Sequence, residues 1–146
     1  FLISVKLVTT YNQSVSLSYF LTGLEPTALS VEQRTFEAPE YETTVGIDLT
    51  KLDAAQIAAQ IAQAKTMLPE GHTFKSVGSY QIEEDVPAGN SVFNRNKTFG
   101  KQHTSFVVRF TEDGKETESS AGKTSYIYYE AEVTVEPDGT LSIEEN

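Results

Sequence analysis

TKLDAAQIAAQIAQAKTML, residues 50–68, is the stretch of this sequence that decides its fold. It is dense in Ala and Gln, which favour the helical conformation. Four of its apolar residues recur at spacings of four, three and four, as on a helix that buries one stripe of its surface. They are Ile57, Ile61, Ala64 and Leu68. The sequence therefore predicts one helix over about residues 51–68.

Both ends of this helix carry local signals. Thr50, followed three residues later by Asp53, resembles a capping box with Asp in place of the usual Glu. Pro69 and Gly71 follow the last apolar position. They end the helix because proline cannot continue it and glycine suits the reversal of the chain.

The residues before the helix have the period of β-strands. Residues 2–9 and 15–22 place apolar side chains at every second position, which is typical of half-buried strands. The link over residues 10–14 is short enough for a hairpin. A third strand is expected over residues 31–36. Residues 43–47 are either a short strand or an extended approach to the helix.

Strands resume after the helix. The clearest alternation lies around Phe106, Val108 and Phe110, which should face the core. Residues 116–122 read as a polar loop, and Pro-Asp-Gly at 137–139 is a strong turn signal. The expected strands are residues 72–77, 80–82, 105–111, 123–135 and 140–143.

This order of elements predicts the α+β class. One central helix should pack on a mostly antiparallel β-sheet, because a hairpin precedes the helix and further strands follow it. We expect one β-rich domain over residues 1–146, since a chain of this length builds one core. The C-terminal hairpin, residues 123–146, is a candidate appendage.

The charge of the chain narrows its partners. There are 21 Asp and Glu residues against 11 Lys and Arg, a formal net charge of −10. Nucleic-acid binders neutralise phosphates with basic residues, and anionic membranes repel an acidic surface. We therefore expect neither nucleic acid as a partner nor insertion into a membrane. The lack of cysteine excludes disulfides and thiolate chemistry.

Residues that could carry catalysis or bind metal are few. His72 and His103 have no local motif that brings a nucleophile and an acid beside them, so we expect both to be structural. Calcium needs about six to eight oxygens around a loop, and the consecutive acids at residues 83–85 cannot all converge on one ion. We expect no metal, no cofactor and no enzyme. A small glycosidase-like enzyme stays open, because so acidic a chain offers many carboxylate pairs.

A cationic and aromatic segment is the strongest candidate for ligand binding. Residues 93–103 hold Phe side chains, amides and three of the 11 cationic residues. Aromatic faces stack on sugars, and planar polar groups hydrogen-bond their hydroxyls. The predicted contact residues are Arg95, Lys97, Phe99 and Lys101. The alternative is an ordinary turn whose Phe residues anchor it to the core.

Three pieces in the middle of the chain form a series. They are LPEGHTFKSVG at residues 68–78, VPAG at 86–89 and the strand expected around 104–110. In this order they resemble the mucin-binding (Mub/MucBP-type) repeats of Gram-positive surface adhesins. The resemblance implies a ubiquitin-like β-grasp sheet crossed by one helix, and an extracellular location on a chain that binds host glycoproteins. It covers the middle third of the chain and implies no particular binding residue.

Together these observations favour a non-enzymatic extracellular or cell-surface module that binds a glycan or protein, or serves as a spacer. The alternative is a structural subunit of a pilus or fibre. Such a subunit would self-assemble through its N-terminal strand, because main-chain pairing works equally well between chains. The chain opens with Phe1, which indicates either a removed leader or a piece of a larger protein. The assembly residues would be Leu2, Ile3, Val5 and Leu7.

Overall fold

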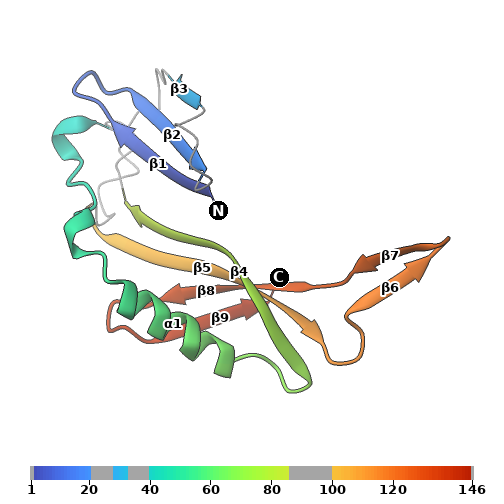
Figure 1. Cartoon of the computed structure of the whole chain (residues 1–146). Coiled ribbons are helices and arrows are strands. Elements are labelled where there is room, and N and C mark those ends of the chain that lie inside the picture. The colour runs from blue at the N-terminus through green and yellow to red at the C-terminus, as the bar shows by residue number, and fades with distance from the viewer. Residues whose placement is uncertain (1, 21–27, 33–39, 86–99, 146) are drawn as a thin grey trace, which may run out of the picture. The chain divides into compact units, whose positions relative to one another are not determined.

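The expected helix, the N-terminal hairpin and the strands expected over residues 105–111 and 140–143 are present in the computed structural model (Figure 1). The structure describes residues 2–20, 28–32, 40–85 and 100–145. In these ranges strands predominate, their pairings are antiparallel and α1 is the one α-helix, so the predicted α+β class is confirmed. The elements are β1 (Leu2–Val8), β2 (Ser14–Phe20), β3 (Ala28–Glu32), η1 (Tyr41–Thr43), η2 (Leu49–Lys51), α1 (Ala54–Thr66), β4 (His72–Glu84), β5 (Gln102–Glu112), β6 (Thr117–Ser120), β7 (Lys123–Tyr126), β8 (Tyr129–Val135) and β9 (Leu141–Glu145).

The chain divides into two compact units. Unit 1 comprises Phe1–Gly46 with Glu84–Lys101, and unit 2 comprises Ile47–Glu83 with Gln102–Asn146. Both units are therefore built from two separate stretches of sequence. Whether they fold cooperatively, as one domain over residues 1–146, stays a prediction.

Unit 1 contains a three-stranded antiparallel sheet in the order β1-β2-β3. β1 and β2 pair along their full length, from Leu2 opposite Phe20 to Val8 opposite Ser14. This confirms the predicted N-terminal hairpin. β3 begins at Ala28, earlier than the expected strand over residues 31–36, and residues 33–36 lie outside the described part of the chain.

The link between β1 and β2 is a tight turn. Asn12 has a φ of 56°, a left-handed conformation that Asn tolerates better than most residues. The Thr9 amide donates to the Gln13 carbonyl at 2.8 Å, and the Asn12 amide donates to the Thr9 carbonyl at 2.9 Å. The Thr9 hydroxyl accepts from the Gln13 amide at 3.2 Å. These bonds fix the register of the hairpin at its closed end.

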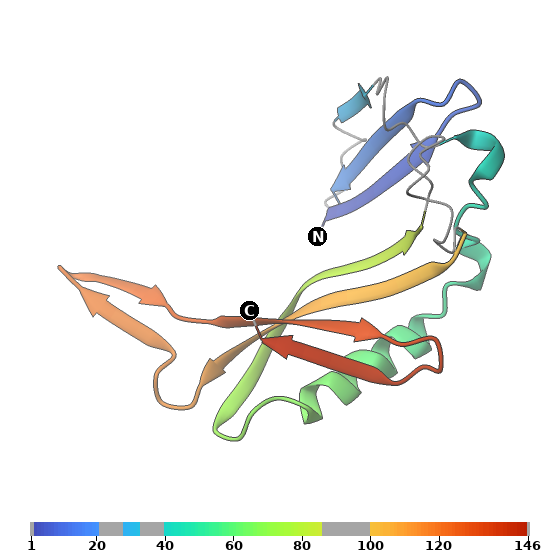
Figure 2. The same cartoon turned by 180° about the vertical axis from the view of Figure 1, so that it is seen from behind.

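Unit 2 contains a four-stranded sheet in the order β4-β5-β8-β9, and α1 covers one face of it (Figures 1 and 2). The sheet side of the core is built from alternate residues of β5 and β8. Phe106, Val108 and Phe110 are between 0% and 3% exposed, and Ala131 and Val133 are fully buried. The inward orientation predicted for the three β5 residues is confirmed. Because side chains alternate along a strand, Arg109 and Glu130 lie on the opposite face.

Three of the four residues of the predicted helical stripe contribute to the same core. Ala64 is fully buried, and Ile61 and Leu68 pack against the core cluster. Burial of this stripe against the sheet stabilises α1 more than helix propensity does. The last α-helical residue is Thr66, so the helix ends shortly before Pro69, as expected.

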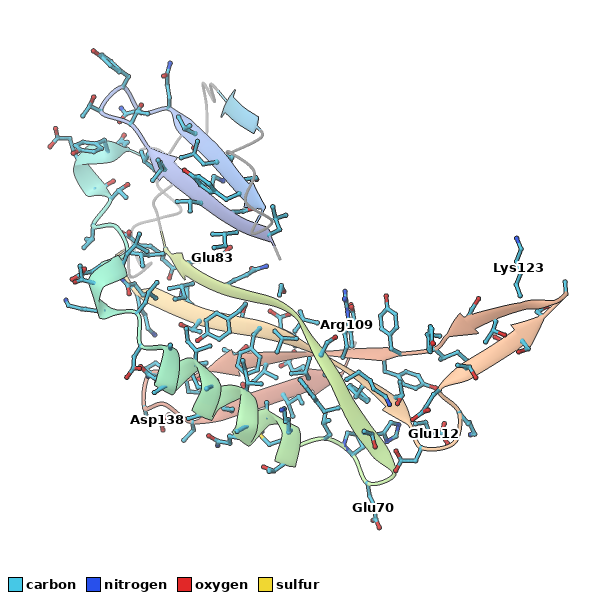
Figure 3. The ribbon with its side chains drawn as sticks, viewed as in Figure 1. Glu70, Glu83, Arg109, Glu112, Lys123 and Asp138 are labelled. Atoms are coloured by element: carbon cyan, nitrogen blue, oxygen red, sulfur yellow. The ribbon has the colours of Figure 1, made fainter. Side chains whose placement is uncertain are left out.

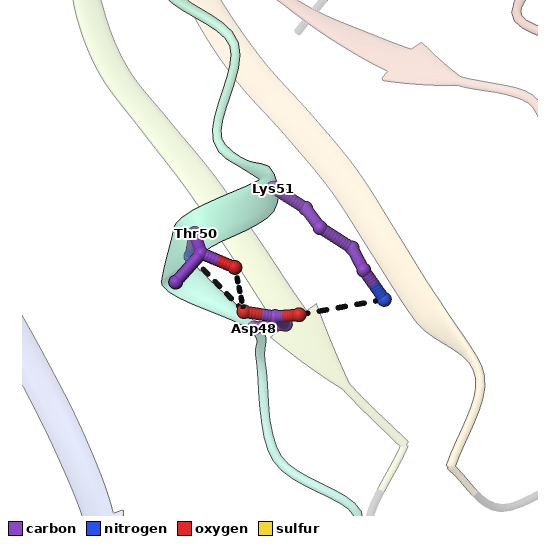
Figure 4. A network of polar contacts seen from close by, with 3 residues as sticks. All are labelled: Asp48, Thr50 and Lys51. Carbon is purple, nitrogen blue, oxygen red and sulfur yellow. Dashed lines mark hydrogen bonds and ion pairs between the residues drawn. The ribbon is translucent and has the colours of Figure 1, made fainter.

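The start of the helix differs from the prediction. Asp53 is the N-cap, and its carboxylate accepts from the Ala55 amide at 2.8 Å. Thr50 was expected in that role. It lies instead in η2, where the Asp48 carboxylate accepts from its amide at 3.0 Å and from its hydroxyl at 2.6 Å (Figure 4). The capping-box prediction was wrong because Asp48 captures Thr50 in a separate turn.

The C-terminal half contains an additional hairpin. Within the expected polar loop over residues 116–122, residues 117–120 instead form β6, which pairs with β7 in a separate two-stranded sheet. The single strand expected over residues 123–135 is divided into β7 and β8. Of the candidate appendage over residues 123–146, only residues 123–126 belong to this hairpin. β8 and β9 are strands of the four-stranded sheet of unit 2, which we call the main sheet. Likewise, the two short strands expected before residue 85 are one strand, β4.

Candidate functional site

The structure places only one residue of the predicted cationic patch. Arg95, Lys97 and Phe99 lie outside the described residues. Lys101 is exposed, and its carbonyl accepts from the Asp85 amide at 2.9 Å. Binding by this patch therefore stays a prediction.

Glu84, the middle residue of the acidic cluster at residues 83–85, has a structural role. The Glu84 carboxylate accepts from the Val45 amide at 2.7 Å and from the Gly46 amide at 2.5 Å. A carboxylate engaged by two backbone amides holds this loop of unit 1 in place. Among the described residues, no group of three His, Cys, Asp or Glu could hold a metal ion.

The four predicted assembly residues all lie on β1. Leu2 is 52% exposed, Ile3 40% and Leu7 46%, while Val5 is half-buried. β1 is at one end of the strand order of its sheet. The structure thus brings apolar side chains together along the strand that was expected to carry assembly.

The two histidines occupy different environments. His72 packs edge-on against Phe110 at 5.4 Å and against Tyr129 at 5.9 Å between ring centroids. Its Nδ1 lies 3.2 Å from the Glu70 carbonyl oxygen. His103 is exposed near the start of β5. The contacts of His72 are those of a residue that closes one end of the hydrophobic core.

A cationic and aromatic cluster lies on the face of the main sheet that α1 leaves uncovered. Arg109 on β5 and Glu130 on β8 are register partners, and Arg109 Nε donates to Glu130 Oε1 at 2.7 Å. The guanidinium carbon of Arg109 lies 5.1 Å from the ring centroid of Tyr128. Arg109 projects away from the side of the sheet that carries α1 (Figure 3). We call Arg109, Glu130 and Tyr128 the outer-face cluster.

A glycine makes room for this arrangement. A Cβ atom on Gly78 of β4 would lie 3.3 Å from Arg109 Nε and 3.3 Å from a methyl carbon of Val107. Arg109 therefore lies close against the bare backbone of Gly78. Glycine inside a strand often marks such a close approach. A Cβ atom there would require the side chain of Arg109 or Val107 to shift by a few tenths of an ångström.

The outer-face cluster keeps its charge and stays accessible. The hydrogen bond with Glu130 is the main cause that raises the pKa of Arg109, and desolvation opposes it. The side chains of Arg109 and Glu130 are 39% and 40% exposed, and Tyr128 is 52% exposed. The cluster thus offers a fixed cation, a carboxylate acceptor and an aromatic ring to a ligand from solvent. Sugars and polar peptides suit this combination.

Sequence reasoning did not find the outer-face cluster. Its one local signal is the aromatic run Tyr-Ile-Tyr-Tyr at residues 126–129, in which Tyr126 is 81% exposed. Arg109 reads as an ordinary outward residue of a strand. The contact with Glu130 depends on the register of β5 and β8, which local periodicity does not specify.

A small cavity lies elsewhere in unit 2, at the start of α1. Its volume is about 180 Å³, and its lining includes Asp53, Gln56, Gln60, Tyr80 and Thr104. The Tyr80 hydroxyl donates to the Gln60 side-chain oxygen at 2.7 Å, and burial raises the pKa of Tyr80. This bond pairs the hydroxyl group of β4 with the amide oxygen of α1 where the helix packs on the sheet.

No protein-family model, curated protein or solved structure matches this chain. In the described part of the chain, no helix is long and apolar enough to cross a membrane. The candidate site therefore rests on the geometry of the chain itself.

Proposed function

We propose that this chain is a non-enzymatic binding module of an extracellular bacterial surface protein, with a glycan or a glycoprotein as its ligand. The observation that supports the proposal is the outer-face cluster, where the exposed Tyr128 lies beside the Arg109–Glu130 ion pair. The excess of acidic over basic residues, 21 against 11, agrees with an uncharged glycan rather than an acidic one. The predicted residues Arg95, Lys97, Phe99 and Lys101 are a second contact surface within the same proposal.

Substitution of the exposed aromatic ring tests this site. Tyr128→Ala should weaken binding to the glycans or glycoproteins that the unmodified chain retains on an array, by about tenfold in the dissociation constant. Tyr11→Ala is the matched control. Tyr11 is 83% exposed but lies in the β1–β2 turn of unit 1, so its loss should change nothing. Equal binding by all three proteins would remove the outer-face cluster from the proposal.

The second candidate is a structural subunit of a pilus or fibre that assembles through β1. It is favoured by the exposed Leu2, Ile3 and Leu7 on a strand at the end of its sheet. Exposed apolar edge strands pair readily with other chains. Light scattering of the purified chain at rising concentration tests this candidate, because assembly raises the average mass and a spacer or binding module alone keeps the mass of one chain.

A small glycosidase-like enzyme stays a prediction. Its general acid would need a raised pKa.

We further propose that the fold is related to the β-grasp arrangement that the resemblance to mucin-binding repeats implies. Support comes from unit 2, where one helix packs on one face of a four-stranded sheet. The order of elements differs from that arrangement, because all four strands of this sheet follow the helix in the sequence. An experimental structure tests this relationship through the direction and order of every strand around the helix.

A further inference from the structure

We infer that β1 pairs with β1 of a second copy of this chain, in an antiparallel register centred on Val5. The inference rests on the proposed assembly role of β1, names the partner and the register, and replaces open-ended growth through this strand by a closed pair. Such a pair is closed by a two-fold axis, because the same strand serves on both sides. It would join two three-stranded sheets into one continuous sheet.

The β1–β2 turn shows which backbone groups of β1 point outward. The Thr9 amide donates to the Gln13 carbonyl, so these two residues form a hydrogen-bonded pair. Hydrogen-bonded and non-hydrogen-bonded pairs alternate in an antiparallel ladder. The odd-numbered residues of β1 therefore bond to β2, and the even-numbered ones direct their amides and carbonyls to the edge of β1 with which no other described strand pairs. These are Leu2, Ser4, Lys6 and Val8.

A register centred on Val5 uses all of these groups. It places Leu2 opposite Val8 of the second copy and Ser4 opposite Lys6, so even-numbered residues form the new hydrogen-bonded pairs. Ile3 then lies opposite Leu7, and each exposed apolar side chain of β1 gains an apolar neighbour. All seven residues of β1 take part.

Lys6 selects this register over its neighbours. A shift that centres the pair on Lys6 would bring two ammonium groups directly opposite each other, which destabilises a strand pair. A shift that centres it on Ser4 would leave both Leu7 and Val8 without a partner in β1 and shorten the ladder. A lysine on an edge strand commonly limits indiscriminate pairing. The Val5-centred register is the one that pairs all seven residues of β1.

The charge distribution of the chain also favours contact at β1. All 21 acidic residues lie from Glu25 onward, so β1, β2 and the turn between them carry none. Two copies with a net charge of −10 repel each other least where both surfaces lack acidic groups. β3 offers only five residues and ends in Glu32, so pairing of β1 with β3 of another copy would give a shorter ladder.

A charge exchange across the two-fold axis tests the register. Analytical ultracentrifugation of the full chain should show a weak dimer, because one strand pair buries less than the roughly 1,200 Å² of a stable interface. Ser4→Lys places two ammonium groups opposite the two Lys6 side chains, and we expect the dimer dissociation constant to rise about tenfold. Ser4→Lys combined with Lys6→Glu should restore the dimer, because each new pair is then attractive.

Ser18→Lys is the matched control. Ser18 lies opposite Ser4 on β2 and shares its hydrogen bond of 3.2 Å, so this variant loses the same bond and gains the same charge away from the axis. Its dimer should match that of the unmodified chain. Failure of the double variant to restore the dimer would overturn the Val5-centred register.

The remaining outcomes separate this inference from the wider assembly proposal. Growth beyond two copies that Ser4→Lys abolishes would leave assembly through β1 standing and overturn the closed pair. A dimer that Ser4→Lys leaves intact would overturn both, as would a chain that stays monomeric up to about 1 mM.

Discussion

Two aspartates in this chain make the same local structure. In Asp48-Leu49-Thr50 and in Asp138-Gly139-Thr140 the carboxylate accepts from the amide and from the hydroxyl of the threonine two residues later. This is the turn that Asp and Asn favour between regular elements. The turn at residues 137–139 was predicted from its Pro-Asp-Gly sequence. The one at Asp48 was missed, because Thr50 also fits the start of a helix.

The Asp138 turn should make stability depend on pH in the acid range. Hydrogen bonds from Thr140 lower the pKa of Asp138 below its ordinary value of 3.8 in the folded chain. The ionised carboxylate therefore stabilises the folded state above the unfolded pKa, and this contribution is lost as the pH falls through the folded pKa. Asp138→Ala should lower the melting temperature at pH 7 and have little effect near pH 2.

A melting curve at each pH measures this difference. Glu136→Ala at the same turn is a control that removes one carboxylate, with the bond that it accepts from the Ser142 hydroxyl at 3.2 Å, but leaves the Asp138–Thr140 bonds in place. A deficit for Asp138→Ala that is as large at pH 2 as at pH 7 would show that the ionised group is not the cause.

At the scale of elements, local periodicity predicted what depends on local contacts. The helix and the β1–β2 hairpin have strong periods of their own, and both were placed within a few residues. The β6–β7 hairpin was missed because its strands bury no residue and so have no apolar alternation. Its turn has positive φ at Ala121 (51°) and Gly122 (78°), the geometry of a tight hairpin, without the usual Asn-Gly signal.

The start of α1 can be tested by comparing its two candidate caps. Asp53→Ala removes the carboxylate that accepts from the Ala55 amide, and it should cost about 1 kcal/mol of unfolding free energy. Thr50→Ala should cost clearly less, because Thr50 lies in the preceding turn. Urea denaturation followed by circular dichroism measures both variants. A larger loss for Thr50→Ala would restore the original capping-box prediction.

The sheet core depends on close packing around β5. Phe106 is 1% exposed and stacks on Tyr80 at 5.5 Å between ring centroids. Phe106→Ala leaves a cavity and should lower the unfolding free energy by about 3–5 kcal/mol. Tyr126→Ala, which removes an aromatic ring that is 81% exposed, should change it by less than about 0.5 kcal/mol. Similar losses in both variants would contradict the assignment of the core.

At the scale of the whole molecule, the division into two units was not visible in the sequence. The two segments of each unit are separated in the sequence by a segment of the other unit. No linker or shift of composition therefore marks a boundary between the units. The outer-face cluster has the same origin, because Arg109 and Glu130 meet only through the pairing of β5 with β8. Local sequence patterns therefore did not predict the contacts between residues that lie far apart in the sequence.

Net charge should make the stability of the whole chain depend on salt. A net charge of −10 destabilises the compact state through self-repulsion, and salt screens this repulsion with a Debye length of about 10 Å at 0.1 M. The melting temperature should rise by a few degrees between about 10 mM and 300 mM sodium chloride. A variant in which Glu118 and Glu132, both exposed, are replaced by Gln should show a smaller rise. A melting temperature that falls with salt would mean that ion pairs such as Arg109–Glu130 outweigh the repulsion.

The β6–β7 hairpin has a practical consequence for handling the molecule. Its strands and the turn between them are exposed throughout, and the turn at Ala121–Gly122 lies at the tip of the ribbon (Figure 1). Chain insertions are best tolerated at exposed tips whose backbone supports no core packing. A short epitope or a dye-labelling sequence grafted between Ala121 and Gly122 would therefore be displayed to antibodies or surfaces without disturbing β5 or β8.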